Sequence, residues 1–450
     1  MRLSQIVVVG MMVLAGWIAP ARSAPSDSLT LDQAWQVLLQ RNLTLKQQQA
    51  AIQRAEAALR QARTMRLPTL QAGGSYKYIS EVPRLEVPPP PVPGFQFPEI
   101  QAGANNQYDL YLQVVQPVFT GMRLTNMVRL QNMQLQKTRV QAQRVQQQLL
   151  FQVGRLFYNY QLNKLQKEVL EASLQRLEAG VSRARALYQA QQVTAFDTLR
   201  LANQQLRLRN HIRNVERQND IVLEKLRTIL NLDSLAPPAG VSVTAITMRL
   251  PAEQSFQQQA LAHRPELREM QLRQKSAQLG VRIAKAAYMP QVSAFAAVHY
   301  GNPGANFFKQ EWNVYTLAGV QLTFDVWNWG RSYYRVQEKT ALVRQLSLEE
   351  QKRLRAIREE VHTVYLQMQQ VAENQAYLEQ LVAQESLRYQ LVKSKFENGY
   401  ATSLDLQEAE SALTSAQLQL QQNRIAWMQL QLQMKFVTGT IGKNLEEYHE

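Results

Sequence analysis

Residues 312–330 read WNVYTLAGVQLTFDVWNWG, and this stretch decides the fold. Its side chains alternate between a mostly apolar face and a polar face, which is the period of a β-strand. The apolar face holds Trp312, Val314, Ala318, Val320, Leu322 and Phe324, and the polar face holds Asn313, Gln321 and Thr323. Such a pattern is typical of a strand that separates lipid from a wet lumen. After Gly330 the sequence contains no proline, which permits a very long helix.

The same alternation occurs in four segments. We predict strands at about residues 69–80, 108–119, 291–300 and 312–324, each long enough to cross an outer membrane at a tilt. Aromatic residues gather at both ends of these strands, in a pattern that resembles two aromatic girdles. One group is Tyr76, Tyr78, Tyr108, Tyr300 and Trp312, and the other is Phe119, Phe324, Trp327 and Trp329. A soluble sheet is the alternative, but the flanking helices are too long to fold back over so small a sheet.

The chain contains an internal duplication, with one repeat at residues 31–230 and another at residues 250–439. Each repeat has the order helix, proline, strand, loop, strand, glycine, very long helix, turn and return helix. A shift of 222 residues places Pro68 on Pro290. Internal repeats determine the architecture, because each copy forms the same unit.

The predicted helices of the two repeats are long. The outward helices cover residues 121–190 and 330–397, and the return helices cover residues 197–230 and 405–438. At 1.5 Å per residue, an outward helix is about 100 Å long. A coiled-coil spacing of four and three residues in the first one joins Leu170, Leu174, Leu177, Val181, Ala184 and Tyr188. Each return helix covers only about half of its outward helix. We expect the first helix of each repeat, at residues 31–67 and 253–289, to cover the other half of that outward helix.

Four strands cannot close a membrane barrel, because the smallest such barrels need about eight. An open strand edge in lipid leaves backbone groups unpaired at a cost of several kcal/mol each. The expected fold class is therefore mostly α with membrane β-strands. Each duplicated subunit contributes four strands and long coiled-coil helices, and three subunits supply the strands of a trimeric 12-strand β-barrel. An ordinary soluble coiled coil does not explain strands inserted between the helices.

Residues 1–21 have the pattern of a secretory signal peptide, with basic Arg2, an apolar run at 6–18 and the small residues Ala-Pro-Ala at 19–21. We therefore assign residues 22–450 to a single outer-membrane channel subunit. The apolar run is too short to span a bilayer unaided.

The composition excludes several classes of protein. The chain has no cysteine, and its five histidines are far apart in the sequence, so no metal cluster is visible. A glycine-rich phosphate loop and a nucleophile elbow are both missing. We expect no enzymatic activity and no cofactor. The net charge of +15 permits nucleic-acid binding, but export argues against that partner.

The two loops between paired strands differ. The first is long and rich in proline over residues 83–98, with the run VPPPPVP at 87–93. Proline fixes the backbone and removes hydrogen-bond donors, so we expect a stiff and extended loop. A motif for a proline-binding partner is the alternative.

Four motifs occur in order along the chain. They are QPVFTG at 116–121, VTAFD at 193–197, FDVWNWGR at 324–331 and ENGYATSLD at 397–405. Together with the duplication they resemble the TolC-type outer-membrane efflux protein family, also called outer membrane factors. The resemblance covers nearly the whole mature chain, although each motif alone is weak.

The resemblance implies a homotrimer with a barrel in the outer membrane of a Gram-negative-type cell and a matching α-helical barrel that forms an α-helical tunnel in the periplasm. Its closed tip docks on a periplasmic adaptor (membrane fusion protein) and an inner-membrane pump. It also implies a passive exit duct of a tripartite efflux or type I secretion system. Such a duct carries small molecules, ions or polypeptides.

The family has two carboxylates three residues apart at the constriction, and Asp405 and Glu408 occupy these positions. A spacing of three places both on one helix face, so three subunits form two acidic rings that favour cations. For Asp405, the alternative is a solvated residue at a helix start, where the dipole favours a negative charge.

The chain departs from the family at the tip. Well-known members close it with a Tyr and an Arg of the second hairpin that bond an Asp of the first. The Asp corresponds to Asp197, but the Tyr position holds Phe396 and the Arg position holds Ala401. We predict tip contacts at Asp197, Phe396 and Gly399, and the closed state needs other bonds than the usual ones.

The two helix pairs differ in charge. Residues 121–230 contain 18 Lys/Arg against 7 Asp/Glu, whereas residues 330–440 contain 13 against 12. We predict an outer basic face on the lower half of the tunnel that meets an acidic adaptor or envelope polymer. Its residues are Arg183, Arg185, Arg200, Arg207, Arg209 and Arg213. A solvated basic face without a partner is the alternative.

Two further functions compete with the exit duct. A substrate-specific porin has no use for a helical tunnel of about 100 Å. An exported coiled-coil scaffold that holds acidic envelope polymers would leave the membrane at high salt, whereas an embedded barrel would not.

Overall fold

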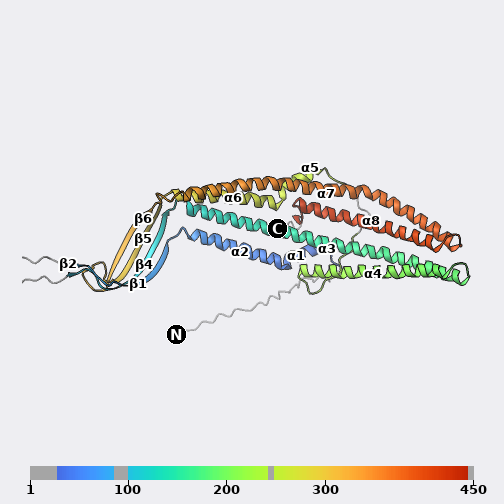
Figure 1. The fold of residues 1–450 in the computed structure, drawn as a ribbon, viewed down its shortest axis with the longest axis horizontal. Helices are drawn as coiled ribbons and strands as arrows, with labels where there is room; N and C mark the ends of the chain where they lie inside the picture. Colours follow the sequence, from blue (N-terminus) through green and yellow to red (C-terminus); the bar gives the residue numbers. More distant parts are fainter. Residues whose placement is uncertain (1–27, 86–99, 242–247, 444–450) are drawn as a thin grey trace, which may run out of the picture.

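The computed structural model describes residues 28–85, 100–241 and 248–443. The predicted signal peptide and most of the proline-rich loop lie outside these residues. Figure 1 shows an elongated subunit with a small sheet at one end and long helices that run to the other.

The sheet contains four strands, two from each half of the chain. These are β1 (Thr69–Tyr78), β4 (Asn106–Phe119), β5 (Gln291–Asn302) and β6 (Asn313–Thr323). All neighbours are antiparallel, in the order β1-β4-β5-β6. A short pair, β2 (Arg84–Leu85) with β3 (Ile100–Gln101), lies at the base of the long loop and was not predicted. The strands β1 and β6 form the two edges and have no second neighbour in the described chain.

Two helical hairpins extend from the sheet. The outward helices are α3 (Arg123–Gln189) and α7 (Arg331–Glu397), of 67 residues each. The return helices are α4 (Ala195–Leu230) and α8 (Ser403–Val437), about half as long. The expected fold class, mostly helical with four strands and long helices, is therefore confirmed for the subunit.

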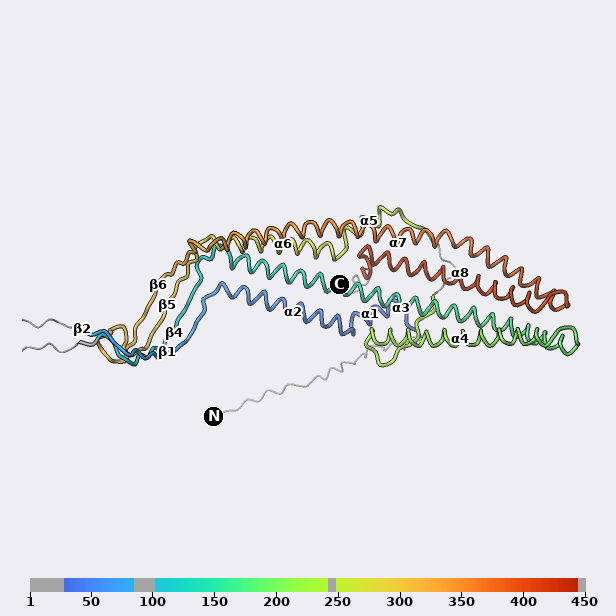
Figure 2. Tube along the Cα trace, in the orientation of Figure 1, coloured from blue at the N-terminus to red at the C-terminus, as the bar shows by residue number. Residues whose placement is uncertain are grey.

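The single first helix expected in each repeat is wrong, because each is broken in two. The pieces are α1 (Leu31–Arg41) and α2 (Leu43–Thr64), then α5 (Glu253–His263) and α6 (Pro265–Lys285), followed by the short 3₁₀ turn η1 (Ala286–Tyr288). Asn42 ends α1 and also caps α2, since its Oδ1 accepts from the Leu45 amide at 3.1 Å. Pro265 begins α6 and keeps the preceding Arg264 extended. As expected, α2 and α6 pack beside the sheet-proximal half of the outward helices (Figure 2), and α6 contacts both α3 and α7.

The strand-to-helix turns of the two repeats share an unusual backbone. Gly121 and Met122 have φ of 59° and 66° before α3, and Trp329 and Gly330 have φ of 54° and 77° before α7. Two successive left-handed residues turn the chain sharply from sheet to helix, and glycine takes one position in each turn because it adopts this region freely. A Cβ at Gly121 would also lie 2.6 Å from Cβ of Met289.

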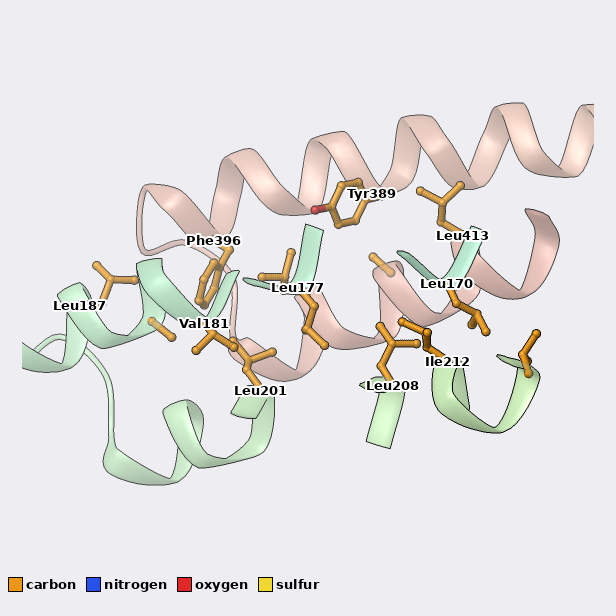
Figure 3. Packing of buried hydrophobic residues seen from close by; sticks show 14 residues of the cluster. Leu170, Leu177, Val181, Leu187, Leu201, Leu208, Ile212, Tyr389, Phe396 and Leu413 are labelled. Atoms are coloured by element: carbon orange, nitrogen blue, oxygen red, sulfur yellow. The ribbon is translucent and has the colours of Figure 1, made fainter. Parts of the chain in front are cut away.

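The buried core is divided along the helices instead of forming one centre. One cluster joins α3, α4, α7 and α8 near the tip, a second joins α1, α3, α4 and α8, and a third joins α5, α6, α7 and α8. Figure 3 shows the tip cluster, in which Leu177, Leu208 and Phe396 come from three different helices. The predicted seam of α3 contributes to it through Leu170, Leu177, Val181 and Ala184.

Candidate channel faces and helical tip

The sheet has one apolar face that the described chain leaves uncovered. Leu110, Val314, Val320 and Leu322 are 55–69% exposed on this face. Four strands with so many bare aliphatic side chains are unfavourable in water, because burial of apolar area is the main favourable term in folding. The pattern of exposure suits contact with lipid.

Aromatic side chains lie at both ends of this face. At one end Tyr108 contacts Tyr76 and Trp312, with ring centroids 5.1 and 5.8 Å apart, and Trp312 stacks on Tyr300 at 4.7 Å. At the opposite end Trp329 is 86% exposed. The first group expected from the sequence therefore lies together at one end, whereas Trp327 and Trp329 of the second group lie between the end of β6 and the start of α7.

The other face of the sheet carries an unforeseen polar cluster. Nδ1 of His299 lies 2.9 Å from Oδ1 of Asp109. The His299 ring stacks on Tyr315 at a centroid distance of 4.9 Å and meets the tilted ring of Tyr111 at 5.7 Å. The register explains this arrangement, because Tyr111, His299 and Tyr315 are directly paired on adjacent strands. The period of two places Asp109, Tyr111 and His299 on the polar face of their strands, but only the cross-strand register brings them together.

At the tip of each hairpin, the return helix begins with the same kind of capping box. Thr194 and Asp197 cap α4, and Thr402 and Asp405 cap α8, each hydroxyl accepting from the amide three residues later. Hydrogen bonds from the side chain and backbone of Thr402 lower the pKa of Asp405. Asp405 therefore has the local role of a helix-start residue, while both Asp405 and Glu408 are exposed.

The two hairpins are also bonded to each other at the tip. Oγ of Ser403 donates to Oδ1 of Asp197 at 2.5 Å, and this bond, followed by those from Thr194, lowers the pKa of Asp197. The guanidinium of Arg183 donates to the backbone carbonyl of Glu397. Residues other than the family's usual Tyr and Arg therefore join the hairpins, and the sequence did not identify Ser403 or this role of Arg183.

Phe396 and Gly399 have packing and turn functions at the tip. Phe396 is 1% exposed, and it points from α7 toward the α3 side chains that include Val181 and Leu187 (Figure 3). The Phe396 ring, which lacks the hydroxyl group of a tyrosine, is therefore part of the buried core. Gly399 has φ of 78° in the α7–α8 turn, where a Cβ would meet nothing within 4 Å but the backbone favours glycine.

The predicted basic residues are mostly exposed. Arg185, Arg207 and Arg213 are exposed, and Arg209 pairs with Glu178 at 2.8 Å. Arg200 is partly buried, with its guanidinium carbon 4.8 Å from the Phe196 ring centroid. Arg183 is exposed as well but is bonded to the second hairpin.

A buried polar cluster between α3 and α8 was not predicted. Glu410 is 3% exposed and accepts from Oγ of Ser173 at 2.5 Å, from Arg176 at 3.1 Å and from Oγ1 of Thr414 at 2.7 Å. Arg176 also donates to Thr414 at 2.9 Å and lies over the ring of Tyr389. A buried carboxylate is stable only with such partners.

Within residues 28–85, 100–241 and 248–443, none of the helices has the length and apolarity that a bilayer crossing requires. In the same ranges no group of three or more His, Asp or Glu residues is placed to hold a metal ion.

A bare apolar sheet face, joined to helical hairpins about 100 Å long, defines a channel subunit with a lipid-facing wall and a helical extension. The family model described as "Outer membrane efflux protein" matches residues 34–232 and 257–440, one segment in each repeat. The chain belongs to this family, which consists of outer-membrane channel proteins and not of enzymes. By sequence, no curated protein matches the chain significantly.

Solved channels share the fold. The outer membrane protein VceC of Vibrio cholerae is 17% identical with a TM-score of 0.75, over 91% of this chain and 96% of that one. The CmeC outer membrane channel of Campylobacter jejuni is 12% identical with a TM-score of 0.75, over 99% and 97%. The MtrE outer membrane channel of Neisseria gonorrhoeae, solved in an open state, is 15% identical with a TM-score of 0.73, over 91% and 88%.

Proposed function

We propose that three copies of this chain form a passive exit duct of a tripartite efflux or type I secretion system. The observation that carries the proposal is the four-strand sheet with two open edges and one bare apolar face. Three sheets joined edge to edge supply twelve strands, enough to close a barrel in lipid. The hairpins then extend into the periplasm, where the tip meets an adaptor and an inner-membrane pump.

Membrane insertion is tested by a pair of neighbouring substitutions. Leu112 lies on the apolar face and is 49% exposed, while Gln113 lies on the polar face of the same strand. Leu112→Arg places a charge against lipid, which costs about 2–4 kcal/mol near the bilayer centre, whereas Gln113→Arg faces the lumen. We expect Leu112→Arg to reduce the yield of membrane-embedded trimer and Gln113→Arg to leave it near normal.

The assembly itself is measured by light scattering of the detergent-solubilised protein. A mass of three subunits with mixed helix and strand by circular dichroism supports the duct. A monodisperse monomer that retains its strands contradicts it. Release of the protein from membranes by high salt would favour a scaffold instead.

The proposed aperture consists of Asp405 and Glu408, which are both exposed beside the tip turn. Glu408→Gln removes one charge and leaves the Thr402–Asp405 cap intact, so its effect isolates the ring charge. We expect lower cation selectivity in planar bilayers and weaker block by multivalent cations. Unchanged selectivity would place Glu408 away from the conducting path.

A further inference from the structure

A cavity of about 450 Å³ lies where the sheet joins the helices. Figure 2 shows the ends of β5 and β6 meeting the starts of α3 and α7 and the end of α6 at this place. Three basic side chains reach the cavity, Arg123 from α3 and Arg335 and Lys339 from α7. The apolar part of the wall includes Met127 and Ile283.

The cavity has an excess of positive charge. Arg123 and Arg335 are exposed, and neither guanidinium has an ion-pair partner among the residues that the structure describes. Nζ of Lys339 lies 2.8 Å from Glu338. Asp325 is the one carboxylate that lines the cavity, and it also lies 3.6 Å from Arg331. Two unpaired guanidinium groups beside an apolar wall suit a ligand with one anionic and one apolar end.

The strand residues of the cavity indicate the side on which it opens. Gln291 and Thr323 are directly paired and both line the cavity. By the period of two they share the polar face of the sheet with His299 and Tyr315, not the bare apolar face. If three such sheets form the barrel proposed above, the cavity opens toward the lumen.

Gly280 of α6 gives the cavity a wall without a side chain. A Cβ at this position would have no neighbouring heavy atom within 4 Å, although the residue lies inside a helix. The cavity is therefore open beside Gly280, and a large side chain at this position would extend into it.

We propose that this cavity is a lumen-side binding site for amphiphilic organic anions that pass through the duct. Arg123 and Arg335 hold the anionic group, and Met127 and Ile283 contact the apolar part. The inference rests on the proposed channel function, because the polar face is the pore face only in a closed barrel.

The test uses purified protein in a neutral detergent and naphthalenesulfonate as the probe, with binding measured by calorimetry. The double variant Arg123→Gln with Arg335→Gln should raise the dissociation constant at least tenfold, because two charge-assisted hydrogen bonds are lost. Gly280→Leu should weaken binding as well by filling the cavity. Arg129→Gln, an exposed arginine further along α3, is the matched control and should bind as the unmodified protein does.

Two comparisons identify the ligand chemistry. Naphthalenemethanol, a neutral compound of similar size, should bind weakly, and equally to the unmodified protein and to the double arginine variant. Unchanged affinity for the sulfonate in the double variant would overturn the proposal. Competition by phosphatidylglycerol in nanodiscs would also overturn it, because the ligand would then be a lipid headgroup.

Bilayer recordings on the same preparations separate this inference from the proposed function. Conducting channels that do not bind the sulfonate would remove the cavity proposal alone. Protein that forms no channels would contradict the proposed function, whatever the calorimetry shows.

Discussion

The buried carboxylate of Glu410 gives the sharpest prediction about stability. Glu410→Ala removes the acceptor of Ser173, Arg176 and Thr414 together. Removal of one partner of a buried ion pair costs about 3–5 kcal/mol. The Arg176 side chain remains 20% exposed and regains some hydration, so the lower end, about 3 kcal/mol, is expected here.

The perturbation should act locally, because the carboxylate joins α3 to α8 within the tip half of the hairpins. Hydrogen exchange followed by mass spectrometry reports the free energy of such local opening. A loss of about 3 kcal/mol corresponds to exchange about two orders of magnitude faster in the α3 and α8 peptides around Ser173 and Glu410. Peptides from the sheet should keep their protection.

Two variants serve as controls for this prediction. Glu168→Ala removes an exposed carboxylate from the same helix as Ser173, and exchange should change little. The double variant Glu410→Met with Arg176→Met replaces both charges by apolar side chains and should recover much of the protection. The reasoning is refuted if Glu410→Ala exchanges within about twofold of the unmodified protein, since that is under about 0.5 kcal/mol.

Three further predictions concern the tip, the strand-to-helix turn and the basic face. The pKa of Asp197 is lowered on folding, so its stabilisation is fully present above the unfolded pKa of about 3.9 and is lost as pH falls through the folded value. Proteolysis of the tip should therefore increase only below about pH 4, and Asp197→Asn should reduce this pH dependence to the part that comes from Asp405, whose pKa is also lowered. Gly121→Ala should reduce the yield of folded trimer on gels through left-handed strain of about 1–3 kcal/mol and a steric clash, whereas Gly280→Ala should fold normally. Reversal of Arg207 and Arg213 to glutamate should weaken adaptor association at low salt without affecting the trimer, and retained association would contradict a basic docking face.

Much of the fold can be predicted from local patterns. The alternation around Val320 and Leu322 identifies a strand, and the absence of proline after Gly330 permits the helix of α7. The breaks at Asn42 and Pro265 were missed, although both residues carry known signals for a helix start.

The sites could be predicted less completely than the fold. The positions of the motifs predict that Asp197, Phe396 and Asp405 lie at the tip. In the structure all three lie at the helix ends that form the two tip turns. The bond from Ser403 to Asp197 and the use of Arg183 between hairpins had no sequence signal. These bonds come from other positions than those of the family's Tyr and Arg, so the motif alone does not identify them.

By itself, the sequence determines which segments are strands and helices, which face of each strand is apolar, and that the two halves repeat. These properties are encoded in periods of two and about 3.6 residues, which are local. Only the tertiary structure decides which polar groups meet, as in the Ser173–Glu410 contact across 237 residues of sequence. The physical reason is that such contacts depend on the axial offset and rotation of one long helix against another, and both are set by packing summed over many side chains.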